Sequence, residues 1–144
     1  MKANQLINPQ EAEITVGARF RVLLILWFGI FASLGFLLLL ALLTPGSGQP
    51  NQTLTFAFLG IGCVVVTVSV FIKRTFTNKA IAQHDAASLQ SGYIVAFALS
   101  EAAGLFALLD HFITGSSYYY FGFAIAAIGM LLNFPKKDDV RATI

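Results

Sequence analysis

Four long apolar runs dominate this sequence and restrict the folds that are open to it. They cover residues 22–43, 54–72, 93–113 and 118–134. An α-helix rises 1.5 Å per residue, so about 20 apolar residues cross the ~30 Å hydrocarbon core of a bilayer. Each run is close to that length. The sequence therefore predicts an all-α, polytopic membrane protein built as a four-transmembrane-helix bundle.

The composition agrees with a membrane protein. Hydrophobic residues make up 57% of the chain and charged residues 11%, which excludes a disordered protein and opposes a soluble domain. Four spans use most of the 144 residues and leave no room for a separate soluble domain. We expect residues 1–144 to form a single integral membrane domain, with helices at about 22–43, 54–72, 86–113 and 118–134.

Residues 1–21 form a polar leader that we expect to be cytoplasmic. Asn8 can cap a helix, Pro9 suits the first helical position, and Glu11 can complete a capping box. The leader is therefore either an interfacial helix that runs into the first span or a frayed polar segment. For the later helices, Asn51 or Thr53 is the predicted cap of the second, and Asp85 that of the third.

Basic residues occur on alternate sides of the four runs. None lies in the connections 44–53 and 114–117, whereas short loops rich in Lys and Arg stay cytoplasmic. We therefore expect a multi-pass protein of the cytoplasmic (inner) membrane with both termini cytoplasmic. No soluble face gathers these charges, so we expect no nucleic-acid partner. The nine basic residues are Lys2, Arg19, Arg21, Lys73, Arg74, Lys79, Lys136, Lys137 and Arg141.

One carboxyl group lies near the middle of the third run. Glu101 is two residues from the midpoint of 93–113, which places it within ~3 Å of the bilayer midplane. No Lys or Arg lies inside any run, and burial without a cationic partner favours a neutral carboxyl group. We expect Glu101 to be protonated and to face a helix interface. It then either hydrogen-bonds to Ser100, Thr67, Ser69 or a carbonyl, or exchanges a proton where water reaches it.

Small residues recur at every fourth position of the third helix. Such stripes let two helix backbones approach closely in lipid, either within one bundle or between subunits. The sequence leaves both arrangements open, and a shorter stripe lies in the fourth helix. The predicted helix-packing residues are Gly92, Ala96, Ser100 and Gly104, with Gly122 and Ala126.

Asp110 and His111 form a second polar pair, at the outer end of the third helix. They are a candidate ligand contact at the outer interface, where His111 could ligate a haem or a chlorophyll magnesium. A lone interfacial histidine is more often a polar tip, so we predict no pigment, haem or other cofactor apart from bound lipid. No metal motif, phosphate loop or nucleophile–base pair occurs, and we predict that the chain is not an enzyme.

The segment 98–108, Ala-Leu-Ser-Glu-Ala-Ala-Gly-Leu-Phe-Ala-Leu, resembles the ion-binding helix of the c subunits (proteolipids) of rotary ATP synthases. Those helices carry an Ala-Leu-x-Glu-Ala pattern followed by apolar and aromatic residues. In that family the carboxylate helix leaves a basic cytoplasmic loop and runs outward, which is the direction predicted here. The resemblance implies a proton-binding hairpin in which Glu101 is the proton-carrying carboxylate.

Two functions are consistent with these observations. The first is an accessory or structural subunit of a larger bioenergetic membrane complex, respiratory or photosynthetic. The chain has 14 phenylalanines and several small-residue stripes, which favour contact with lipids and with other transmembrane subunits or further copies of itself. The second is a proton-coupled, c-subunit-like proteolipid or small transporter that operates through Glu101. The sequence favours the first.

Overall fold

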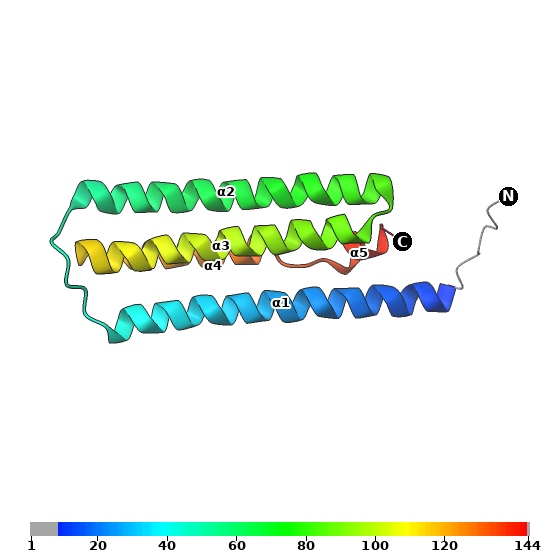
Figure 1. The fold of residues 1–144 in the computed structure, drawn as a ribbon, viewed down its shortest axis with the longest axis horizontal. Helices are drawn as coiled ribbons and strands as arrows, with labels where there is room; N and C mark the ends of the chain where they lie inside the picture. The colour runs from blue at the N-terminus through cyan, green and yellow to red at the C-terminus, as the bar shows by residue number, and fades with distance from the viewer. Residues whose placement is uncertain (1–8, 144) are drawn as a thin grey trace.

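The computed structural model of this chain describes residues 9–143, which form an all-α bundle (Figure 1). Helix α3 packs against α1, α2 and α4. The α2–α3 connection and α5 lie at one end of the bundle, here called the basic end, and the α1–α2 loop lies at the other (Figure 1). The helices are α1 (Pro9–Leu43), α2 (Gln52–Gln83), α3 (Ala86–Thr114), α4 (Tyr119–Leu132) and α5 (Lys137–Arg141).

Three helices, α1, α2 and α3, are long and apolar enough to cross a membrane, whereas α4 is apolar but shorter. The 14 residues of α4 rise only ~21 Å. The apolar run 118–134 predicted a longer helix. At its start, the helix is shorter because Tyr118 is the cap residue and lies outside the helix. At its end, the proline at 135 disfavours the helical conformation in the residue that precedes it.

Helix α1 is continuous from Pro9 to Leu43, so the polar residues from position 9 onwards belong to the same helix as the first apolar run. The leader was expected to be either an interfacial helix or a frayed segment. From Pro9 onwards it is helical, and it continues into the first apolar run without a break. Proline is the first helical residue, as predicted. The predicted cap Asn8 lies outside the described residues, as does Lys2.

Helix α2 continues well past the end of its apolar run, and the predicted boundary at residue 72 is wrong. Residues 73–83 are mostly polar but contain no proline or glycine, so nothing in them breaks the helix. The helix ends at His84, which adopts the left-handed conformation with φ of 49°. The long cytoplasmic loop expected between the second and third helices is thereby reduced to His84 and Asp85.

The caps of α2 and α3 are set by local chemistry. Asn51 accepts a hydrogen bond from the backbone N–H of Leu54 at 3.1 Å, and Asp85 accepts one from Ala87 at 3.0 Å. Both residues were predicted for these positions, Asn51 as one of two alternatives. Ser88 donates a second hydrogen bond to the Asp85 carboxylate at 2.6 Å. The predicted start of the third helix is therefore correct.

We expect the start of α3 to lose stability in acid. The hydrogen bond from Ser88, and then those from backbone N–H groups, lower the pKa of Asp85 below its ordinary value of 3.8. Because the native pKa is depressed, the contribution of this group is present above pH 3.8 and is lost as the pH falls through the native value. Thermal unfolding of Asp85→Asn, which keeps a cap acceptor, should lack this acid dependence. An unchanged acid dependence in that variant would contradict the assignment.

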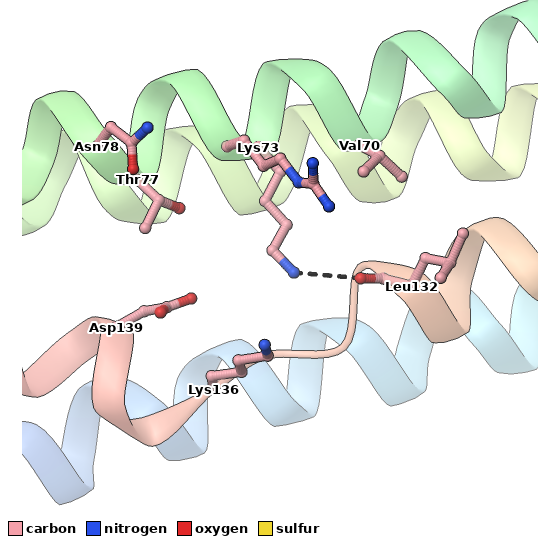
Figure 2. A pocket seen from close by; sticks show the side chains of 8 residues that line it. Val70, Lys73, Thr77, Asn78, Leu132, Lys136 and Asp139 are labelled. Carbon is pink, nitrogen blue, oxygen red and sulfur yellow. Dashed lines mark hydrogen bonds between the residues drawn. The ribbon is translucent and has the colours of Figure 1, made fainter.

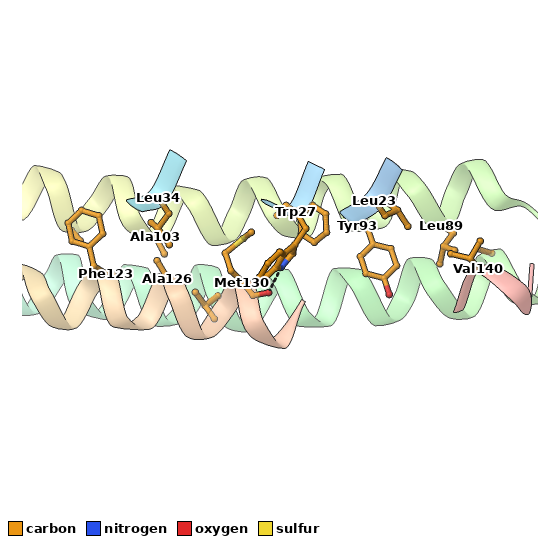
Figure 3. Close-up of a cluster of buried hydrophobic side chains, with 14 of the residues drawn as sticks. Leu23, Trp27, Leu34, Leu89, Tyr93, Ala103, Phe123, Ala126, Met130 and Val140 are labelled. Carbon is orange, nitrogen blue, oxygen red and sulfur yellow. Dashed lines mark hydrogen bonds between the residues drawn. The ribbon is translucent and has the colours of Figure 1, made fainter. Parts of the chain in front are cut away.

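The buried apolar side chains form one column along the bundle, between α1, α3 and α4 and on to α5 (Figure 3). Its members include Leu23, Trp27, Leu34, Leu89, Tyr93, Ala103, Phe123, Ala126, Met130 and Val140. Outside this column, large apolar side chains of α1 and α2 point away from the bundle, such as Ile25, Phe28, Phe36, Val64 and Phe71. Soluble monomers rarely expose apolar patches of this extent, whereas lipid solvates them well.

Candidate functional site

Glu101 lies half-buried on α3 and bonds to the neighbouring helix α1. Its Oε1 accepts a hydrogen bond from the Ser33 hydroxyl at 2.5 Å. None of the partners considered from the sequence, Ser100, Thr67, Ser69 or a carbonyl, is the partner found. Within residues 9–143, no cationic side chain forms an ion pair with Glu101. The ion pair found in that part of the chain joins Arg141 to Glu13. The carboxyl group therefore joins two helices through one hydroxyl.

Ser100 lies ~100° around the helix from Glu101 and faces different neighbours. The amide nitrogen of Asn133 donates hydrogen bonds to Ser69 at 2.9 Å and to Ser100 at 3.1 Å. All three side chains are fully enclosed, so this cluster joins α2, α3 and the residue that follows α4. The Asn133 Oδ1 atom is buried without a partner. Asn133 was missed because its position in an apolar run gave no indication of where it would point.

Asp110 is buried between α2 and α3 near the end of the bundle opposite the basic end. One of its carboxylate oxygens accepts hydrogen bonds from Thr55 at 2.8 Å and from Thr114 at 2.9 Å. The other oxygen, Oδ2, is buried without a partner. Asp110 therefore contributes a further hydrogen bond between transmembrane helices. The sequence predicted a ligand contact at the outer interface, whereas in the structure other residues of this chain enclose the Asp110 side chain.

His111 is buried as well and does not project as a free polar tip. Its Nε2 lies 2.7 Å from the Thr44 carbonyl oxygen, which can only accept, so Nε2 carries the proton. Its ring lies against Tyr119, with 4.4 Å between the ring centroids. The histidine thus fastens the α1–α2 loop to α3. Within residues 9–143, no group of three His, Cys, Asp or Glu side chains could hold a metal ion.

The small residues of α3 and α4 lie on faces buried within this chain. Gly92 faces Phe76 of α2, and Gly104 faces Leu34 of α1. An added Cβ at Gly122 would lie 2.6 Å from the Cβ of Ala107. Ala96, Ser100 and Ala126 have no exposed surface. The contacts of this stripe are therefore internal to the bundle.

Lys73 is a second site residue that the sequence did not reveal, because it was assigned to a loop. It lies inside α2, and its ammonium group donates to the backbone oxygen of Leu132 at 3.2 Å (Figure 2). It also donates to the backbone oxygen of Phe134 at 3.5 Å. The group also sits 5.0 Å from the ring centroid of Tyr93. Free carbonyls at a helix C-terminus carry partial negative charge, so Lys73 caps α4 from a neighbouring helix.

The chain matches no known family model, no curated protein sequence and no solved structure. The resemblance of segment 98–108 to the c-subunit helix stays a prediction.

Chemically, the polar groups described above connect helices: Glu101 joins α1 to α3, Asp110 joins α2 to α3, and Asn133 joins α2, α3 and the end of α4. Hydrogen bonds between helices in a membrane contribute ~0.6 kcal/mol each on average.

Proposed function

We propose that this chain is a small, non-enzymatic integral membrane protein that serves as an accessory or structural subunit of a larger membrane complex. The observation that carries this proposal is how polar and apolar side chains are divided between the interior and the surface of the bundle. Polar groups in the interior hold one helix to another, while the apolar faces of α1 and α2 point outward and are available to other transmembrane subunits. The resemblance of 98–108 to a proteolipid helix favours a bioenergetic complex, respiratory or photosynthetic.

We further propose that the four apolar helices α1 to α4 all lie within the cytoplasmic membrane, with both termini on the cytoplasmic side. Arg74, Lys79 and Lys136 support this orientation, since all three are exposed and lie in the C-terminal part of α2 or directly before α5. Helix α4 is short for a span, and local thinning of the bilayer or contact with another subunit would accommodate it. Labelling of cysteines introduced one at a time at Ser47 and Lys79, with Cys63 replaced by serine, tests the orientation, with Lys79→Cys reactive only from the cytoplasmic side.

A specific observation also favours the second candidate, a proton-coupled protein that operates through Glu101. Its carboxyl group is only half-buried and has a hydroxyl partner in place of a cation. A carboxyl group inside a transmembrane bundle can take part in proton transfer where water reaches it. The geometry favours the structural role, because Ser33 already engages Glu101 across the α1–α3 interface.

Glu101→Gln separates the two functions. An amide oxygen can still accept from Ser33, so for a structural subunit we expect a loss of about 0.5 kcal/mol or less and unchanged co-purification of partner subunits. Native mass spectrometry of the complex and unfolding in mild detergent measure these outcomes. The control is Ser33→Ala, which removes the hydrogen bond that Glu101→Gln keeps and should therefore cost more, about 0.6 kcal/mol.

The alternative makes the opposite prediction. If the variant folds with wild-type stability yet abolishes proton-dependent transport, and if a carbodiimide labels Glu101 selectively in the wild type, then the proton-coupled function is correct. Purification of the wild-type protein from native membranes as a stable, isolated monomer would contradict the accessory-subunit proposal.

A further inference from the structure

A continuous groove runs along α2 beside the end of α4. One part, of about 230 Å³, lies near the basic end, and the adjoining part, of about 330 Å³, lies toward the middle of the bundle. The two parts share Val70, Arg74 and Leu132 as lining residues, so they form one cavity system. The groove exists because α4 stops at Leu132, whereas α2 continues alongside to Gln83.

The two parts of the groove differ in chemistry. The part near the basic end is lined by three cations, Lys73, Arg74 and Lys136, and by one carboxylate, Asp139 (Figure 2). The other part is lined mainly by apolar side chains, which are Val66, Val70, Phe71 and Leu132, with Thr67 and Arg74. A molecule with an anionic head and a hydrocarbon chain complements both parts at once.

Asp139 offsets only part of the positive charge in the groove. Asp139 accepts a hydrogen bond from the Tyr93 hydroxyl at 2.5 Å, and within residues 9–143 no carboxylate forms an ion pair with any of the three cations. Lys73 directs its ammonium group at two carbonyl oxygens and lies over the Tyr93 ring. Arg74 and Lys136 are exposed. A phosphate group between these two side chains would offset part of the excess positive charge.

We propose that this groove binds one anionic glycerophospholipid. Its phosphate lies among Lys73, Arg74 and Lys136, and an acyl chain runs along Val70 and Phe71. Basic pockets between transmembrane helices on the cytoplasmic side are suited to anionic headgroups. The proposal rests on the membrane placement argued above, and it adds a specific lipid class and a defined site to it.

The test compares the full-length protein in vesicles of phosphatidylcholine alone and of phosphatidylcholine mixed with phosphatidylglycerol. Native mass spectrometry should find one phosphatidylglycerol retained in preference to phosphatidylcholine, and the mixed vesicles should raise Tm. Arg74→Gln combined with Lys136→Gln, both exposed positions, should reduce this preference roughly 30-fold, as expected for the loss of two surface charges. Lys73 is kept in this variant because it also caps α4.

The matched control is Lys79→Gln combined with Lys137→Gln, which changes net charge equally at two exposed positions outside the groove. It should retain the wild-type preference. Three results would contradict the proposed site. The two double variants could lose the lipid preference equally, the wild type could retain both lipids equally, or inorganic phosphate could raise Tm by the same amount. Failure of the wild type to insert into either vesicle would instead contradict the membrane placement on which the site depends.

Discussion

Replacing Trp27 by alanine should lower the free energy of unfolding by about 3 kcal/mol, the lower end of the usual range for removing a buried tryptophan. The lower end applies because lipid, in place of water, competes for the apolar surface, and packing is the term that remains. The Trp27 ring is 5% exposed and stacks on Phe31 with 5.0 Å between centroids. Its Nε1 donates to the Met130 carbonyl oxygen at 2.8 Å, which joins α1 to α4.

Unfolding in detergent, followed by circular dichroism, measures this loss. Trp27→Phe keeps most of the ring contact and loses the hydrogen bond, so we expect about 1 kcal/mol. The neighbouring Phe28 is 60% exposed and provides the control: Phe28→Ala should cost well under 1 kcal/mol. If both alanine variants lose the same stability, α1 does not present Trp27 to the bundle as described.

The second large effect is expected at Gly122, where α4 lies close to Ala107 of α3. The Cβ of an alanine there would lie 2.6 Å from the Cβ and 3.2 Å from the Cα of Ala107. Neither atom can move without the α3 backbone, so the two helices must separate. Overpacking of this kind typically costs about 1–3 kcal/mol, and the same unfolding measurement applies to Gly122→Ala.

Gly60 provides a matched control for the same substitution. It lies on α2, and no atom is within 4 Å of the Cβ position. Gly60→Ala should therefore be neutral or should stabilise the protein by up to about 1 kcal/mol through helix propensity. Two glycine-to-alanine changes are thus expected to have opposite signs. A similar loss at Gly60 would mean that α2 packs against a surface other than the one in this bundle.

Much of the fold follows from the sequence, and the errors have one physical cause. The start of α3 was correct because Asp85 caps it through a contact only two residues away. The end of α2 was wrong because hydropathy locates the edge of the apolar layer, whereas a helix ends only where its backbone is interrupted. Residues 73–83 cross that edge without an interruption. The same reason explains why the polar residues between 9 and 21 belong to α1.

The site was less predictable, because its contacts join residues far apart in the chain. Glu101 was correctly singled out from the sequence, but its partner Ser33 is 68 positions away. That pairing depends on how α1 and α3 are rotated about their axes, which no local pattern specifies. Lys73 and Asn133 were missed for the same reason, since their roles appear only when the end of α4 is placed beside α2 and α3.

The two-residue link between α2 and α3 has a mechanical consequence. His84 closes one helix and Asp85 opens the next, so neither residue is available to lengthen or bend the connection. We expect the two helices to move together as a stiff hairpin. Sliding or tilting of α1 against this hairpin would occur across the surface that carries Ser33 and Glu101. An external subunit that pulls on α1 would load that hydrogen bond together with the one from Trp27 to Met130.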